Sequence, residues 1–265
     1  MYPILFKIGN FPIGTYGLLL TLGFFLALAL AQHLGHREGI AREHISDLAI
    51  TVLLAGVVGS KLLMVIVDLC DGASLASVFD LGYLRAGGAI HGGIIGATLA
   101  FFWRVKRLKL PLARTLDCLT PAVALGQAVG RLGCFAAGCC YGTPCTLPWA
   151  VTFTNPYAQS LSGTPLAMPV HPVQLYTFLA NLTVMASLLV IRRHRRFAGQ
   201  VSGCYFILEG IGRMITEHWR GDLDRGFLMG LPWLSTGRLT SALFILFGAG
   251  LLAWYGRRRR AEAAA

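Results

Sequence analysis

Three arginines and one glutamate in this chain have the chemistry and the spacing to bind a phosphate. Arg213, Glu217 and Arg220 are three and four residues apart, so a helix would place them on one face. Arg131 stands in Gly130-Arg131-Leu132-Gly133, where the glycines let backbone and ligand approach closely. A guanidinium binds phosphate through a planar fork of donors. Converging guanidiniums would therefore suit an anionic lipid headgroup.

Each of these arginines also has a structural interpretation. Arg213 could form an internal ion pair with Glu217, or with Glu209 one turn in the other direction. Arg131 could be an interfacial side chain whose charged head reaches the aqueous surface along an apolar stem. The choice depends on whether the guanidiniums converge in the fold.

Two histidines and one tyrosine are candidates for proton transfer and hydrogen bonding. His91 begins His91-Gly92-Gly93, and a histidine beside glycines that leave room for a ligand is typical of a general base. A histidine that is only hydrogen-bonded within the fold is the alternative. His171 precedes Pro172, which suits a first helical turn, so a structural role at a helix start is favoured there. Tyr16 could donate to the same site, although tyrosines are also common at membrane interfaces.

Seven apolar segments must position these residues. Hydrophobic residues make up 55% of the 265-residue chain and charged residues only 13%, and the mean hydropathy is +0.63. A membrane-spanning helix needs about 20 mostly apolar residues. We predict an all-α, polytopic membrane protein with seven transmembrane helices in one domain over residues 1–260, followed by a disordered tail at 261–265. The segments are 14–32, 47–67, 87–103, 113–129, 174–191, 200–216 and 238–256.

Four basic clusters indicate the orientation of these segments. They lie at 37–42, 104–114, 192–196 and 257–260, between or after the apolar segments. Because basic loops stay in the cytoplasm, the N-terminus is predicted to face out and the C-terminus to face in. The net charge of +11 is then a topology signal and does not indicate nucleic-acid binding.

The predicted topology brings several candidate residues into the outer half of the bundle. They are Tyr16, His91, Arg131, His171 and Arg213. A cation at membrane depth is costly unless it faces a partner or a polar site, so cations outside the basic clusters are functional candidates. These cations are Lys7, Lys61, Arg85, Arg131, Arg213, Arg220, Arg225 and Arg238. The long connection 130–173 lies on the same side, and loops of that length are usually functional.

These motifs resemble those of the prolipoprotein diacylglyceryl transferase family over nearly the whole chain. The matching stretches are Thr15-Tyr16-Gly17-Leu18, His91-Gly92-Gly93-Ile94-Ile95-Gly96, Gly130-Arg131-Leu132-Gly133, His171-Pro172-Val173-Gln174-Leu175-Tyr176 and Arg213…Glu217…Arg220. The resemblance implies a multi-pass enzyme of the bacterial inner membrane with its active site toward the outer leaflet. Such an enzyme moves diacylglyceryl from phosphatidylglycerol to the lipobox cysteine thiol of a preprolipoprotein and releases glycerol phosphate. It implies no metal and no organic cofactor.

The resemblance also implies roles for individual residues. His91 would activate the acceptor thiol, while Arg131 and Arg213 would hold the phosphate. A thiol has an ordinary pKa of about 8.5, so help with its deprotonation is needed. The residues implied to bind substrate are Tyr16, Gly92, Gly93, Gly133, Gly142, His171, Glu217 and Arg220.

The chain departs from the family in several polar positions. Family members usually have Asn, Asn and Glu where this chain has Cys134, Ala137 and Cys139. Thr177 stands in place of a Glu, Lys61 of an Arg and Glu209 of a Tyr. These changes concern the donor and acceptor more than the fold, because the lost side chains could bond near the headgroup.

Four cysteines gather where the chain departs from the family: Cys134, Cys139, Cys140 and Cys145. An extracytoplasmic position favours a structural disulfide, with Cys139 or Cys140 paired to Cys134 or Cys145. The spacing C-x4-C-C-x4-C does not match the paired C-x2-C pattern of zinc sites. A catalytic thiol is not required, because the resemblance places the nucleophilic thiol on the substrate.

Three other functions remain open from the sequence. A transferase of the same fold could use a different acceptor. A membrane thiol-disulfide protein would explain the cysteines, but it usually has a C-x-x-C pair, which this chain lacks. A lipid or anion transporter would explain the arginines, but polar groups on one side of the membrane are not typical of that class.

Overall fold

The computed structural model describes residues 2–9, 11–74, 83, 87–221, 226 and 235–264. Two of the candidate cations, Arg85 and Arg225, lie outside these residues. The chain separates into two compact units. The first comprises Met1–Leu34 and Leu116–Ala265, and the second comprises Gly35–Thr115.

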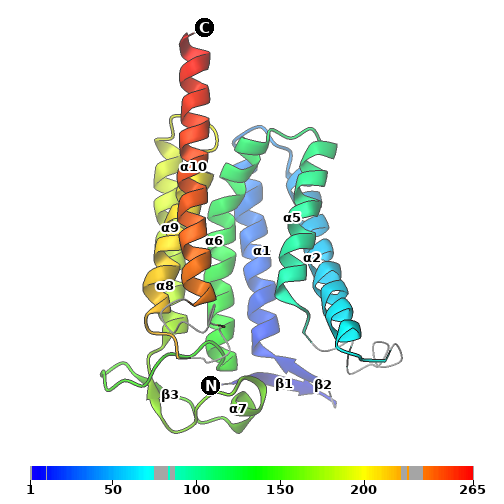
Figure 1. Cartoon of the computed structure of the whole chain (residues 1–265), viewed down its shortest axis with the longest axis vertical. Coiled ribbons are helices and arrows are strands. Elements are labelled where there is room, and N and C mark those ends of the chain that lie inside the picture. Colours follow the sequence, from blue (N-terminus) through cyan, green and yellow to red (C-terminus); the bar gives the residue numbers. More distant parts are fainter. Residues whose placement is uncertain are drawn as a thin grey trace. The chain divides into compact units, whose positions relative to one another are not determined.

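Seven long helices coincide with the seven predicted apolar segments (Figure 1). Among the described residues, four of them are both long and apolar enough to cross a membrane: α1, α2, α8 and α10 as far as Arg259. The other three carry charged side chains that include Asp117, Arg131 and Arg213. The helices are α1 (Thr15–His36), α2 (Arg42–Cys70), α5 (Ile90–Arg107), α6 (Leu112–Ala137), α8 (Val173–Arg193), α9 (Gln200–Glu217) and α10 (Thr236–Ala264).

Short elements complete the largely helical fold. Strands β1 (Ile4–Ile8) and β2 (Phe11–Gly14) form an antiparallel hairpin immediately before α1. A second antiparallel pair, β3 (Val151–Thr152) and β4 (Pro169–Val170), lies with helix α7 (Pro156–Ser162) in the connection between α6 and α8. The last helix, α10, continues to Ala264, into the segment expected to be disordered.

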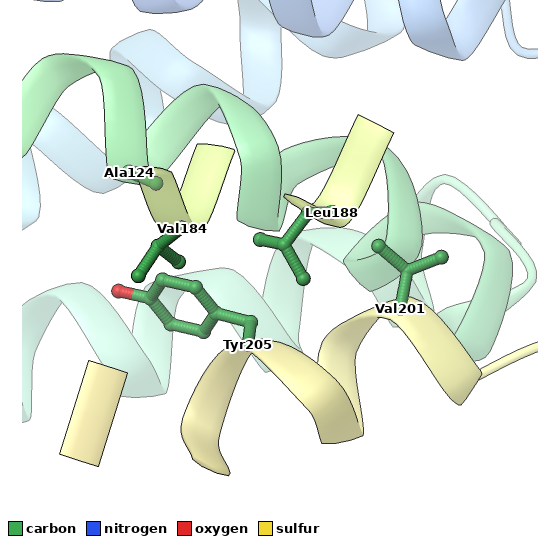
Figure 2. Close-up of a cluster of buried hydrophobic side chains, with 5 residues drawn as sticks. All are labelled: Ala124, Val184, Leu188, Val201 and Tyr205. Atoms are coloured by element: carbon green, nitrogen blue, oxygen red, sulfur yellow. The ribbon is translucent and has the colours of Figure 1, made fainter. Parts of the chain in front are cut away.

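The core of the first unit lies where α6, α8 and α9 meet. Figure 2 shows Ala124 of α6 beside Val184 and Leu188 of α8 and Val201 and Tyr205 of α9, all of them buried. Helix α10 packs against α9, where Gly203 and Gly210 let the two helices approach closely. These helices form the frame that carries Arg131 and Arg213.

A buried carboxylate fixes the start of α9 to α6. Asp117 of α6 is fully buried and accepts hydrogen bonds from the backbone N–H groups of Gly199 at 2.8 Å and Ser202 at 2.9 Å. Arg195 adds an ion pair at 3.7 Å. The first N–H groups of a helix have no acceptor within the helix, and Asp117 of the neighbouring helix α6 provides an acceptor for them.

In the second unit, α2 and α5 pack through glycines. Gly92 lies so close to the carbonyl of Gly59 that a Cβ atom would overlap the backbone, and Gly96 meets the carbonyl of Ala55 in the same way. Gly93 approaches the carbonyl of Gly56. Close helix approach through small residues is typical of membrane helices. The glycines after His91 therefore have a packing role, which the sequence interpretation as room for a ligand did not include.

Replacing Gly92 with alanine should destabilise the second unit. The added methyl group would meet the backbone of α2, which cannot move aside as a flexible side chain could, and overpacking of this kind typically costs about 1–3 kcal/mol. We expect a lower midpoint of thermal unfolding in detergent. Gly87→Ala is the matched control, since a Cβ atom at Gly87 meets nothing within 4 Å. Equal midpoints for the two variants would contradict the packing role.

Candidate active site

A buried glutamate joins the two arginines at the end of α9. The carboxylate of Glu217 lies 3.5 Å from the guanidinium of Arg213 and 3.8 Å from that of Arg220. Glu217 is only 2% exposed. The ion pair expected from the four-residue spacing is confirmed, and the same carboxylate also holds Arg220. One anion between two cations leaves this cluster with a net positive charge.

The start of α10 holds this carboxylate in place. The Ser235 hydroxyl donates to the second oxygen of Glu217 at 2.8 Å and accepts from the backbone N–H of Arg238. Gly237 packs directly against the carboxylate, where a Cβ atom would overlap it. Glu217 is thus fixed by side chain and backbone, and through it Arg213 and Arg220 are fixed.

Arg131 lies near the end of α6 with its donors unused. Among the residues that the structure describes, its guanidinium has no hydrogen bond and no ion pair. Its charge nevertheless acts on Arg213 and Glu209 of α9, and on the thiols of Cys134 and Cys140. Two helices therefore bring cations to one region, and the guanidinium donors of Arg131 are unused among the described residues.

The chain after α6 is tied to the chain after α9. Gly142 and Arg220 form an antiparallel bridge, in which Thr143 N–H donates to the carbonyl of Trp219 at 2.8 Å. A Cβ atom at Gly142 would overlap His171, so this position requires glycine for packing. The bridge sets the place of Arg220 relative to the end of α6.

His171 belongs to an aromatic group at the start of α8. Its Nδ1 lies 3.2 Å from the Tyr176 hydroxyl, which also accepts a hydrogen bond from the Trp149 indole at 2.8 Å. The Trp219 ring lies beside both His171 and Tyr176. These contacts agree with the structural role that the sequence favoured for His171.

Tyr16 lies beside the end of α6. A Cβ atom at Gly133 would come within 3.1 Å of the Tyr16 ring, so the glycine lets α1 and α6 approach closely. Tyr16 is 43% exposed, which leaves part of its ring uncovered near Arg131.

The structure brings three of the four loop cysteines together. The sulfur atoms of Cys134, Cys139 and Cys140 lie within 4.8 Å of one another. All seven cysteines of the chain are free thiols, so the expected disulfide is not formed. Cys145 stands apart, with its backbone N–H bonded to Pro169 near β4. A sharp turn after α6 brings the three thiols together, which the C-x4-C-C-x4-C spacing alone did not predict.

The thiol of Cys140 is the one on which both Arg131 and Arg220 act. Hydrogen bonds from the thiols of Cys134 and Cys139, together with the charges of Arg131 and Arg220, lower its pKa. Sequence reasoning missed this link between the cysteines and the arginines. The three-residue spacing of Arg131 and Cys134 on one helix face was the signal that could have found it.

Comparisons with known proteins show the family of this chain. The family model for prolipoprotein diacylglyceryl transferase matches residues 3–254. The chain belongs to the prolipoprotein diacylglyceryl transferase family. Similar proteins include the phosphatidylglycerol–prolipoprotein diacylglyceryl transferases of Clostridium tetani, 36% identical over 94% of this chain and 95% of the relative, and of Finegoldia magna, 35% identical over 83% and 84%. That of Photobacterium profundum is 33% identical over 95% and 92%.

A second carboxylate, that of Glu209, lies near Arg131 and Arg213 in this member of the transferase family. Glu209 of α9 is acted on by the charges of Arg131 and Arg213, yet its Oε2 is buried without a hydrogen-bond partner among the described residues. From the sequence, Glu209 was an alternative ion-pair partner of Arg213 and a departure from the Tyr that is usual in the family. Arg213 forms its ion pair with Glu217 instead, which leaves Glu209 an acceptor close to the cation cluster.

His91 belongs to the second unit, whereas the arginines of the candidate site belong to the first. It is the second residue of α5 and is exposed. Gly92 and Gly93 follow it at the contact with α2. The predicted site residues of the first unit, by contrast, gather around the ends of α6 and α9: Tyr16, Arg131, Gly133, Gly142, His171, Arg213, Glu217 and Arg220.

Proposed function

We propose that this chain transfers the diacylglyceryl group of phosphatidylglycerol to the lipobox cysteine thiol of preprolipoproteins and releases glycerol phosphate. Family membership and the names of the similar proteins support the reaction. The observation that carries the proposal is the cation cluster. Arg131 with unused donors lies in the electrostatic reach of Arg213, and Arg213 is held in place by a buried carboxylate.

The arginines would act on the leaving group. When the acceptor thiolate attacks the glyceryl carbon, the carbon–oxygen bond breaks and a second negative charge develops on the phosphate. Arg131 and Arg213 would bind these oxygens through charge-assisted hydrogen bonds, which strengthen as the charge develops. Glu217 would orient Arg213 and Arg220, and Arg220 would add a further positive charge.

The remaining predicted residues would serve the two substrates. His91 would assist deprotonation of the acceptor thiol, with Gly92 and Gly93 beside it. Tyr16 and Gly133 would lie along the lipid where α1 meets α6, and Gly142 and His171 would shape the loop above the headgroup. The requirement for glycine at Gly92 and Gly142 is supported by packing, which is compatible with a second role in the site.

The proposed location is the bacterial inner membrane, crossed seven times by a single domain over residues 1–260, with residues 261–265 as a short tail. The N-terminus would face out and the C-terminus in, with the site toward the outer leaflet. The arrangement of the first unit supports this orientation. The N-terminal hairpin and the connection containing β3 and α7 lie at one end of its helices, and the C-terminus lies beyond the other end (Figure 1).

Reporter fusions should test the orientation. A periplasm-dependent phosphatase fused after Ser160 should be active, because Ser160 lies in the exposed helix α7 of the outer connection. The same reporter fused after Arg260 should be inactive, whereas a cytoplasmic fluorescent reporter there should be bright, as the basic cluster predicts. The same reporter response at both positions would contradict an odd number of membrane spans between Ser160 and Arg260.

The reaction itself is tested with purified protein, phosphatidylglycerol and a synthetic lipobox peptide. Mass spectrometry should detect a peptide heavier by one diacylglyceryl group, together with glycerol phosphate. The control peptide carries serine in place of the lipobox cysteine and should remain unmodified. Release of glycerol phosphate without modification of the cysteine peptide would indicate another acceptor and would reject the proposed one.

A further inference from the structure

Three thiols beside the arginines have no role in the mechanism described so far. Cys134 lies in the last turn of α6, and Cys139 and Cys140 follow the end of that helix. Their sulfur atoms lie within 4.8 Å of one another. A Zn–S bond of about 2.3 Å places two thiolates of one tetrahedral site roughly 3.8 Å apart. Small side-chain rotations would therefore bring all three sulfurs onto one ion.

The backbone is shaped to bring these thiols together. Gly138 and Cys140 have φ angles of 87° and 59°, so the chain turns through two left-handed residues and directs the segment back toward Cys134. A left-handed conformation is strained for a residue with a side chain, and such strain persists where the surroundings enforce it.

Two buried polar side chains enforce this turn. Thr164 donates to the carbonyl of Gly138 at 3.1 Å, and the Gln174 amide donates to the carbonyl of Cys139 at 2.8 Å. Both are at most 1% exposed, and the amide oxygen of Gln174 is buried without a partner among the described residues. The cluster is thus held in advance of any ligand and has an unused acceptor fixed beside it.

The charges around the cluster suit a metal-bound state. Thiols bind metal as thiolates, so the site must release protons when an ion binds. Three thiolates and one Zn²⁺ carry a net charge of −1, which Arg131 and Arg220 would balance. Both arginines already act on Cys140.

We propose that Cys134, Cys139 and Cys140 bind a zinc ion whose fourth coordination position receives the thiol of the acceptor cysteine. Three protein ligands leave one position open, which is typical of zinc sites that act on a substrate. The role of the fourth position rests on the proposed function, because it requires a cysteine-containing acceptor. The three-cysteine zinc site itself does not.

The transfer step follows from this arrangement. The acceptor thiol enters the fourth position and loses its proton, because zinc coordination deprotonates a thiol, and His91 would accept this proton as in the proposed function. The zinc-bound sulfur then attacks the glyceryl carbon of phosphatidylglycerol, a carbon–sulfur bond forms and the carbon–oxygen bond breaks. The electron pair of that bond leaves with glycerol phosphate, near Arg131. The thioether product binds zinc weakly and departs, so the zinc ion is unchanged.

The first test is the metal content of the full chain, purified in detergent under reducing conditions and incubated with Zn²⁺. Mass spectrometry of the elements should find about one zinc per chain after removal of free metal. Cys134→Ser, Cys139→Ser and Cys140→Ser should each lose most of it. Cys145→Ser is the matched control from the same loop and should retain it. A zinc-free wild-type protein, or equal loss in the control, would overturn the proposal.

The second test uses Co²⁺ in place of zinc, because the visible absorption of bound Co²⁺ reports its ligands. It uses the unaltered protein, so the result does not depend on whether the variants fold. Adding the lipobox peptide should strengthen and shift the thiolate bands, and the serine peptide should leave them unchanged. An unchanged spectrum with the cysteine peptide would overturn the role of the fourth position.

Activity separates this proposal from the proposed function. Chelation should abolish diacylglyceryl transfer, and Zn²⁺ should restore it. Full activity in metal-free protein would reject the zinc mechanism while supporting the proposed function. A cobalt spectrum that responds to the cysteine peptide, without product from the zinc-loaded protein, would support the metal site and reject the proposed reaction.

Discussion

Arg131→Ala is expected to lower kcat for diacylglyceryl transfer about 100- to 1,000-fold, the usual loss when one donor to a developing negative charge is removed. Arg213→Ala should have an effect of the same order. Arg131 has no internal partner among the described residues, so its loss removes ligand contacts without leaving a carboxylate unpaired. Initial rates with the lipobox peptide and phosphatidylglycerol measure the effect. Arg193→Ala, an exposed arginine at the end of α8, is the control.

Lysine variants separate charge from geometry. Lysine carries a point charge and cannot reproduce the planar fork of a guanidinium, so Arg131→Lys and Arg213→Lys should recover little activity. A near-normal rate for Arg213→Ala would assign this residue to stability and not to the phosphate. Full recovery by lysine would show that only charge is required.

Glu217→Ala is expected to produce the largest loss of stability. It would leave Arg213 and Arg220 without the carboxylate they share and would leave the Ser235 hydroxyl without its acceptor. Removal of one partner from a buried ion pair costs about 3–5 kcal/mol, and the lower end applies because Arg213 keeps 28% of its side chain exposed. Denaturant titration in mixed micelles measures the difference in the free energy of unfolding.

Two comparisons make this test specific. Glu217→Gln keeps the shape and a hydrogen-bonding oxygen for Ser235, so it should lose less stability than alanine while still losing activity. Glu43→Ala changes an exposed glutamate in the first turn of α2 and should have little effect. If Glu217→Ala were as stable as Glu43→Ala, the buried carboxylate would not stabilise the end of α9 and its contact with Ser235 at the start of α10.

The helices could be predicted because long apolar runs have few other structures available in a membrane protein. The predicted segment 174–191 became α8 (Val173–Arg193), and 200–216 became α9 (Gln200–Glu217). The hairpin of β1 and β2 was less visible, since such short strands lack a periodic pattern long enough to recognise. The crossing of the membrane by all seven helices stays a prediction.

The candidate site was predictable where it lies on one helix. Arg213 and Glu217 meet because of the four-residue period, which is visible in sequence. The cysteine cluster was not predictable in this way, because it depends on the left-handed turn at Gly138 and Cys140. The packing role of the glycines was not predictable either. A glycine that leaves room for a ligand cannot be distinguished in the sequence from one that lets a second helix pack closely, as Gly92 does.

The carboxylate of Asp117 has a consequence for how the chain is assembled during synthesis. The first N–H groups of α9 have no partner within the helix, and the acceptor for two N–H groups at its start belongs to α6, which leaves the ribosome earlier. When α9 emerges, the carboxylate that accepts from its first N–H groups has already been translated. A nascent chain that ends just after α9 therefore already contains the pairing that fixes this helix, before α10 is translated.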